Sequence, residues 1–213
     1  MKFFRHLLSI AAVLAIGSIS ADAVPLRIMT LNTAPACLTP FCVATTAAYS
    51  WPIGTSQRTS MGTLQTRTIT PLVPVPAKLP LPPVTYMYRI TATAGGSTEC
   101  VNALTFDFGP DVPIASDTLG PVDVFVVNEA VGAGPLAKVK SVDRTGNKIA
   151  INFEMGVCWS TYTNSAIVGL KATGRPVAAT AKVIPNYGPA SADVGIRTPA
   201  HLLLPATGGR VFQ

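Results

Sequence analysis

The stretch Leu136-Ala-Lys-Val-Lys-Ser-Val-Asp-Arg-Thr-Gly-Asn-Lys-Ile-Ala-Ile-Asn-Phe-Glu154 decides the fold class, because it has the pattern of a β-hairpin. Two runs, Leu136–Val142 and Lys148–Glu154, flank Arg144-Thr-Gly-Asn147, where Gly and Asn take a positive φ at little cost. The second run alternates between an apolar row and a more polar row, which predicts one buried face and one solvent-facing one. The apolar row is Ile149, Ile151 and Phe153, and the other row is Lys148, Ala150, Asn152 and Glu154.

Outward from this hairpin, the same signals predict five more strands, at Thr85–Thr93, Val101–Phe108, Val122–Val127, Ala166–Ala172 and Val177–Ile184. Most of these runs alternate, whereas Val122–Val127 is apolar on nearly both faces and suits a central strand. Charged residues make up 12% of the chain, about half the usual share, and β-branched residues with Gly and Pro suit strands and turns. The pattern therefore predicts an all-β protein, an antiparallel β-sandwich.

The predicted sandwich resembles immunoglobulin-like domains only in coarse architecture. In true immunoglobulin domains a Trp lies between the two cysteines of the disulfide in sequence. Here Trp159 directly follows Cys158, so the finer pattern is absent.

The predicted domain organisation has four parts. Residues 1–23 form a signal peptide, 24–84 a Thr/Pro-rich irregular extension, 85–184 the β-sandwich and 185–213 a C-terminal segment. Within the extension, Thr63–Thr70 is expected to form one or two edge strands of the same domain. Pro71–Pro83 has six prolines in thirteen residues, which favours extended polyproline II and, we expect, a stiff connector rather than a docking ligand.

The first 23 residues have the three parts of a secretory signal. Lys2 and Arg5 precede an apolar run at 7–16, and small residues follow, ending in Ala21-Asp22-Ala23. The apolar run is shorter than the roughly 20 residues that a membrane-spanning helix needs. We therefore expect cleavage after Ala23 and a secreted, periplasmic or cell-surface location.

All four cysteines follow this segment, and an even number in an exported chain predicts two disulfides with three possible connectivities. We expect Cys37–Cys42, closing a small loop, and Cys100–Cys158, tying two strands together. Metal binding through cysteines is the alternative, but the spacing lacks a second close pair and only one His follows residue 23. No metal or cofactor is expected.

One predicted binding face is basic and comprises Lys138, Lys140, Arg144 and Lys148 on the hairpin. It could meet an anionic surface or polysaccharide, although solvated charges that protect a sheet edge explain it as well. The full chain has a net charge of +6, but no aromatic residue interleaves with these cations, so no nucleic-acid partner is expected. The alternative partner is a second copy of the chain, through self-association.

Other motifs give weaker indications of function. A set of aromatic residues could form a sugar-stacking platform, although packing is the commoner role: Tyr49, Trp51, Trp159, Tyr162 and Tyr187. His201 is the only His after the signal and no G-x-S-x-G motif frames a nucleophile, so no catalytic residue is assigned. Four aspartates match no calcium-loop spacing: Asp107, Asp111, Asp117 and Asp123. Leu204-Pro-Ala-Thr-Gly208 matches a sortase pattern but lacks the apolar stretch and basic tail that such a signal needs.

These observations predict a non-enzymatic, secreted or surface-associated β-sandwich that acts as a binding or structural module. The first alternative is a subunit of an extracellular fibre or coat, because Thr/Ala-rich strands suit strand addition between chains. The second is a small outer-membrane β-barrel, which aromatic residues at 7% and 19 prolines argue against. An enzyme that uses an ordinary carboxylate pair has the least support.

Overall fold

The computed structural model describes residues 23–37, 41–54, 59–72, 83–95, 100–109, 124–128, 135–172, 174–187 and 191–200. The predicted signal peptide up to Asp22, most of the proline-rich run, three of the four aspartates, His201 and the Leu204–Gly208 motif lie outside these ranges. The described part is all-β, with antiparallel and mixed sheets. Within it no helix is long and apolar enough to cross a membrane.

The first sheet, sheet A, has six strands, and every strand pair in it is antiparallel. Its order is β1 (Val24–Pro25), β9 (Val139–Thr145), β10 (Lys148–Cys158), β6 (Cys100–Asp107), β13 (Pro176–Pro185) and β14 (Ala192–Pro199). β1 and β14 are therefore its two edge strands.

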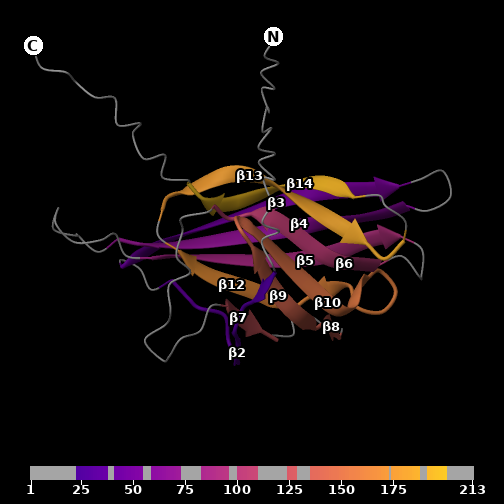
Figure 1. Cartoon of the computed structure of the whole chain (residues 1–213), viewed down its shortest axis with the longest axis horizontal. Helices are drawn as coiled ribbons and strands as arrows, with labels where there is room; N and C mark the ends of the chain where they lie inside the picture. Colours follow the sequence, from indigo (N-terminus) through magenta and orange to yellow (C-terminus); the bar gives the residue numbers. More distant parts are fainter. Residues whose placement is uncertain are drawn as a thin grey trace, which may run out of the picture.

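The second sheet, sheet B, has eight strands and is mixed. Its main path is β2 (Ile28–Leu31), β7 (Val124–Val127), β12 (Ile167–Ala172), β5 (Val84–Gly95), β11 (Asn164–Ser165) and β8 (Leu136–Ala137). β4 (Thr59–Pro71) pairs with β5, and β3 (Cys42–Gly54) pairs with β4. β2–β7 and β8–β11 are parallel pairs. Figure 1 shows β3, β4 and β5 as long strands that run along the longest axis.

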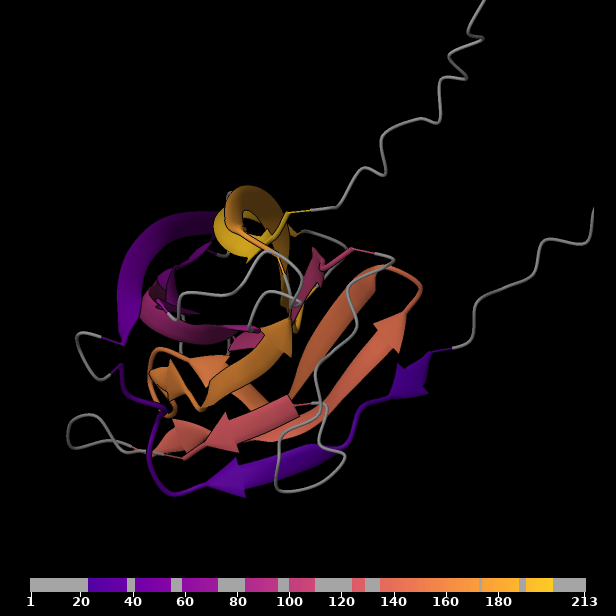
Figure 2. The same ribbon diagram turned by 90° about the vertical axis from the view of Figure 1, so that its left-hand side faces the viewer.

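The main hydrophobic core draws on both sheets, whose strands surround a common interior in Figure 2. Sheet B contributes one alternating row from β5, namely Tyr86, Tyr88, Ile90 and Ala92. Sheet A contributes matching rows from β6 and β10, namely Leu104, Phe106, Ile149, Ile151 and Phe153. Strand alternation sends the intervening residues of β5 and β10 to the opposite face of their sheets.

A second, smaller cluster lies on the other face of sheet B. This outer cluster consists of Ile69, Met87, Phe125 and Val127, and residues of the 31–42 segment pack against it. β7 feeds both clusters, because Val124 and Val126 face the main core while Phe125 and Val127 face the outer one. The prediction that the doubly apolar run Val122–Val127 forms a central strand is confirmed for Val124–Val127, because β7 pairs with β2 on one side and with β12 on the other.

The hairpin that decided the fold class is present, but its first predicted strand, Leu136–Val142, is divided: β8 joins sheet B, and β9 begins at Val139 in sheet A. Lys148 pairs with Thr145, which leaves Gly146 and Asn147 as a two-residue loop. Gly146 has a φ of 57°, as the first central residue of a type II′ turn requires. The five other predicted strands are also present, as β5, β6, β7, β12 and β13.

The prediction for Thr63–Thr70 was wrong in its position. β4 pairs with β3 on one side and with β5 on the other, so it is an interior strand and β3 takes the edge. Five strands were missed: the longer β3 and β14, and the short β1, β2 and β11. β3 was missed because its small and polar side chains hide the period-2 signal, and β14 because its eight residues lie between turn-forming stretches.

Both disulfides have the expected pairing, Cys37 with Cys42 and Cys100 with Cys158. Cys100 and Cys158 are direct partners in the β6–β10 ladder, so this disulfide links adjacent strands of sheet A. Cys37 and Cys42 pack against the outer cluster of sheet B. The two bonds fit an oxidising compartment.

Candidate functional site

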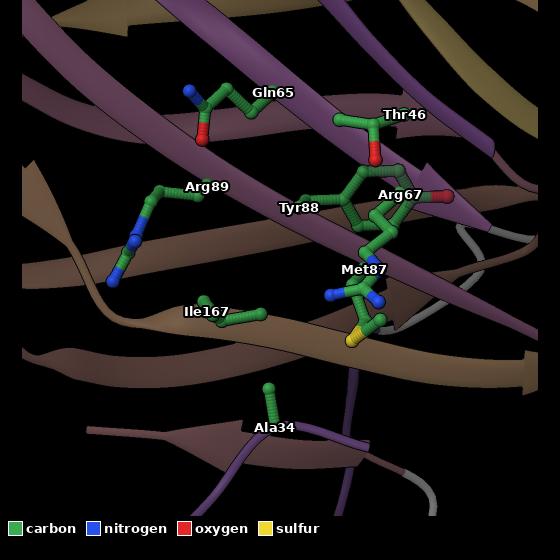
Figure 3. Close-up of a pocket in the computed structure, with 8 residues that line it drawn as sticks. All are labelled: Ala34, Thr46, Gln65, Arg67, Met87, Tyr88, Arg89 and Ile167. Carbon is green, nitrogen blue, oxygen red and sulfur yellow. The ribbon is translucent and has the colours of Figure 1, made fainter. Parts of the chain in front are cut away.

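One hollow lies on the outer face of sheet B, and we call it the outer pocket. Its volume is about 270 Å³, and Figure 3 shows its lining. The lining residues are Ala34, Thr46, Gln65, Arg67, Met87, Tyr88, Arg89 and Ile167. They come from β3, β4, β5, β12 and the segment that follows β2.

Strand register brings the polar lining residues together. Thr46 pairs with Arg67, and Arg67 with Met87, in one row that crosses β3, β4 and β5. The next row pairs Gln65 with Arg89. Arg67 and Arg89 are therefore diagonal neighbours on one face, a relation that separates side-chain origins by about 7–8 Å.

The floor of the pocket is apolar and continuous with the outer cluster. Met87 belongs to that cluster, and Ile167 and Ala34 pack against it. Figure 3 shows Arg89 and Arg67 on either side of Ile167, with Ala34 beyond it. Cys37–Cys42 closes a short loop next to this wall, so the disulfide restricts the segment that carries Ala34.

Gly169 makes this packing possible. It pairs with Met87 on β5 and with Phe125 on β7, and a Cβ built at Gly169 would overlap the Phe125 ring. The ring therefore occupies the space above a residue that has no side chain. Any larger residue at 169 would push Phe125 out of the outer cluster.

The described lining of the outer pocket carries positive charge. Two guanidinium groups line it, and none of the described residues that line it is acidic. Arg89 is partly buried, and its Nε donates to the Ser165 carbonyl oxygen over 3.4 Å, which helps to orient the side chain. Arg67 is exposed, and Thr46 and Gln65 add a hydroxyl and an amide that can donate hydrogen bonds.

The four predicted cations on the hairpin do not share one face. Lys138 and Lys140 are exposed, and each lines a hollow that also contains Glu154. Arg144 lies four residues further along, roughly 13 Å at the rise of a strand. Its Nη2 donates to the Gly109 carbonyl oxygen over 3.0 Å and its Nε to that of Gly146 over 3.0 Å.

Lys148 is exposed at the far end of the hairpin, where it pairs across the ladder with Asp107 on β6. An aspartate directly opposite offsets the positive charge of Lys148. Asp107 also accepts a hydrogen bond from the Gly109 N–H over 2.8 Å, as a turn aspartate does. The predicted basic face is thus divided between the Glu154 region and the hairpin tip.

The Glu154 region is formed by a bulge in β10. Asn152 pairs with Ala103 on β6, but the next partners are Val157 and Val101, so the two strands advance by different numbers of residues. Gly156 takes a φ of 72° there, and a Cβ on it would lie 2.8 Å from the Cys100 Cβ. Glu154 lines two hollows, of about 150 Å³ and 560 Å³.

The five aromatic residues considered for sugar stacking do not form one platform. Trp51 is 1% exposed in the main core, and Tyr49 and Tyr187 pack against that core. Trp159 is 48% exposed, and Tyr162 lies in the same short loop, where the Cys158 N–H donates to the Tyr162 carbonyl oxygen over 2.8 Å. Tyr162 also packs against the main core, so the commoner packing role expected from the sequence applies to all of them except the exposed Trp159.

Two buried tyrosine hydroxyls have structural partners. The Tyr86 hydroxyl donates to the Gly174 carbonyl oxygen over 3.1 Å, and the Tyr88 hydroxyl to that of Arg197 over 2.9 Å. Burial raises the pKa of Tyr86 well above its ordinary value. Burial, and then the neighbouring Tyr86, raise the pKa of Tyr88 in the same direction. Both hydroxyls therefore stay protonated at neutral pH, and they tie β5 to β14 and to the residues just before β13.

In the described ranges, no group of three or more His, Cys, Asp or Glu side chains is placed to hold a metal ion. Searches with the sequence and with the structure found no matching family model, no similar curated protein and no similar solved structure.

Arg67 and Arg89 are the functional candidates that sequence reasoning missed. Twenty-one residues separate them in the chain, so no local motif joins them. The available signal was their parity: Arg89 alternates with the buried row of β5, and so faces away from the main core.

Proposed function

We propose that the chain is a non-enzymatic, secreted β-sandwich that acts as a binding module for an acidic polysaccharide. Its outer pocket takes one carboxylate or sulfate group of that polymer. The observation that carries the proposal is the diagonal placement of Arg67 and Arg89 in a pocket whose described lining holds no acidic residue.

The chemistry of the pocket favours an anion. Guanidinium groups present planar forks of N–H donors that match carboxylate and sulfate oxygens. The side-chain origins of Arg67 and Arg89 lie about one Debye length apart at physiological ionic strength, so a single anion interacts with both side chains. Thr46 and Gln65 supply further donors at the rim.

The size and floor of the pocket favour a sugar residue of a longer chain. At about 270 Å³ it lies just below the roughly 300–1,000 Å³ typical of pockets that enclose a whole ligand. A polymer that inserts one acidic residue and continues along the surface fits this volume. Met87 and Ile167 offer apolar contact to the C–H groups of a sugar ring.

The residues that line the same pocket favour binding without catalytic turnover. Most glycoside hydrolases use a pair of carboxyl groups on either side of the scissile bond. The described lining of the outer pocket contains none. The exported location in this proposal rests on the signal-like residues 1–23, with which the disulfides are compatible.

The test compares two variants that each remove one positive charge, Arg67→Gln in the pocket and Lys148→Gln at the hairpin tip. Calorimetric titrations would use uronic-acid and sulfated oligosaccharides, with neutral oligosaccharides of the same length as the reference. Because a hydrogen bond to a charged group contributes about 1.5–3 kcal/mol, Arg67→Gln should weaken acidic-ligand binding about 10- to 100-fold. Lys148→Gln should change it less than about 2-fold.

Arg67→Lys sharpens the test, because it keeps the charge but loses the planar fork. It should recover only part of the affinity. Equal losses in Arg67→Gln and Lys148→Gln would show a general charge effect, and equal binding of neutral oligosaccharides would show that the pocket does not select an anion. Either result would overturn the proposed function.

A further inference from the structure

β3 is a long edge strand with no charge to protect it. It spans Cys42–Gly54, and none of its thirteen residues is Asp, Glu, Lys or Arg. From Val43 to Thr46 every residue is exposed, on both faces of the strand. Natural edge strands are usually short, or carry Lys, Pro or bulges that prevent pairing with another chain. Here the only such residue is Pro52, near the C-terminal end.

The register shows which backbone groups face the free side of β3. The β3–β4 ladder is regular along its whole length, without a bulge. The Leu72 N–H donates to the Phe41 carbonyl oxygen over 2.8 Å, so Phe41 and the alternate residues after it point toward β4. The N–H and C=O groups of Ala44, Thr46, Ala48 and Ser50 therefore point toward the free side.

The positions of two prolines agree with this assignment of backbone groups to the two sides of β3. Pro71 pairs with Cys42, and Pro52 pairs with Met61. Both are positions at which the β3–β4 ladder uses no N–H, so neither proline removes one of its hydrogen bonds.

In the described ranges, no backbone hydrogen bond reaches the free side of β3 between Ala44 and Ser50. β14 approaches β3 on another side. A Cβ built at Gly195 on β14 would overlap the ring of Tyr49, and Tyr49 packs against the main core. Figure 2 shows β3, in purple, as the outermost strand on its side of the molecule.

We infer that β3 pairs with β3 of a second copy of this chain, antiparallel and across a two-fold axis, so that two sheets B join into one. An identical strand has the same length and the same hydrogen-bonding phase, so each exposed donor meets an exposed acceptor. The strand has no charge, so pairing places no like charges opposite each other.

The charge on the neighbouring strand is also far enough away. Arg67 lies on β4, so it and its symmetry mate would be three strand spacings apart, roughly 14 Å, which is beyond the Debye length of about 8 Å in physiological salt. A two-fold axis perpendicular to the sheet places both outer pockets on the same face. If the proposed function holds, one polymer can then engage both pockets.

The test is the mass of the purified protein in solution, measured by sedimentation equilibrium from low to high micromolar concentration without any ligand. We expect a reversible monomer–dimer equilibrium. Thr46→Pro removes an N–H that points to the free side and that β4 does not use. Because a dimer loses this donor twice, the variant should dimerise at least about 10-fold more weakly. The matched control Thr46→Ala keeps the N–H and should change dimerisation less than about 3-fold.

Hydrogen exchange locates the interface independently of any substitution. The Thr46 and Ala48 amides should gain protection as the concentration rises, while the Lys148 amide, at the hairpin tip, should not. Ala48→Lys provides a second variant if Thr46→Pro lowers the melting temperature, because a lysine on an edge strand opposes pairing.

A monomer at every concentration would overturn the inference. So would a dimer that persists in both folded variants, or protection gained elsewhere but not at Thr46 and Ala48. Because no ligand is present, failure here leaves the proposed function standing, and failure of acidic ligands to bind leaves the dimer standing.

Discussion

The outer faces of the two sheets acquire positive charge in opposite ways. On sheet B, Arg67 and Arg89 are distant in sequence, but the β4–β5 register places them as diagonal neighbours. On and beside sheet A, four cations lie within eleven residues of sequence, yet a bulge, a neighbouring Glu154 and strand alternation separate them. Closeness in sequence thus failed to predict a shared face, whereas cross-strand register produced one.

The difference follows from strand geometry. Successive residues of a strand point to opposite faces and advance about 3.3 Å each, so a local cluster of charges is spread along and across the sheet. Residues on neighbouring strands are separated by less than 5 Å in the hydrogen-bonding direction. A binding site on a sheet is therefore more easily built across strands than along one.

The largest expected effect comes from removing, one at a time, the disulfide in sheet A and the disulfide beside sheet B. Cys100 and Cys158 are 58 residues apart, and Cys37 and Cys42 only 5. In the loop-entropy description, Cys100→Ala with Cys158→Ala should lower the free energy of unfolding by about 4 kcal/mol, and Cys37→Ala with Cys42→Ala by about 2 kcal/mol. Urea denaturation measures both.

The binding readout should reverse that order. Cys37→Ala with Cys42→Ala frees the segment beside the outer pocket and should weaken acidic-ligand binding, whereas the Cys100 and Cys158 variant, where it remains folded, should not. Equal binding in the two variants would show that the 31–42 segment does not shape the pocket.

The second test uses pH, because the two sheets place different aromatic residues in the core. β5 of sheet B contributes Tyr86 and Tyr88, both with raised pKa values, while β6 and β10 of sheet A contribute Phe106 and Phe153. Above pH 10, tyrosines in the unfolded chain release their protons, while the buried ones keep them. The contribution of these two tyrosines to stability is therefore constant up to about pH 10 and is lost as the pH rises further, by about 1.4 kcal/mol per pH unit for each tyrosine.

Denaturant unfolding between pH 8 and pH 11 measures this loss. Tyr86→Phe and Tyr88→Phe should each have a shallower slope above pH 10, although each is less stable at pH 8 because it lacks the bond to Gly174 or Arg197. Unchanged slopes in both variants would assign the alkaline loss to other groups.

The smallest expected effects come from two glycine substitutions, which test the packing of the two outer faces separately. Gly169→Ala should displace the Phe125 ring, and Gly156→Ala should strain the β10 bulge. Each should cost about 1–3 kcal/mol of unfolding free energy, measured by urea denaturation. Only Gly169→Ala should also weaken acidic-ligand binding, because Met87 of the pocket floor shares the outer cluster with Phe125. A loss of binding in Gly156→Ala of the same size would contradict the division between the two faces.

Much of the fold could be predicted because the buried rows are local patterns. Tyr86, Ile149 and Leu104 each belong to an alternating run that identifies a strand and its inner face. β3 could not be found in this way, since its Ala and Thr residues give no apolar row, and only pairing with β4 makes it a strand. Of the candidate site, the sequence identified neither arginine.

By itself, the sequence determined the all-β class, the hairpin with Gly146 in its turn and the inner faces of the predicted strands, and it favoured one of the three possible pairings of the four cysteines. These depend on side-chain period, on turn chemistry and on loop length, which are properties of short segments. Only the tertiary structure decided that β4 is interior, that β3 is an unprotected edge, and that Arg67 and Arg89 share a pocket. Those depend on which strands become neighbours and in what register, and hydrogen bonding between strands from distant parts of the chain sets both.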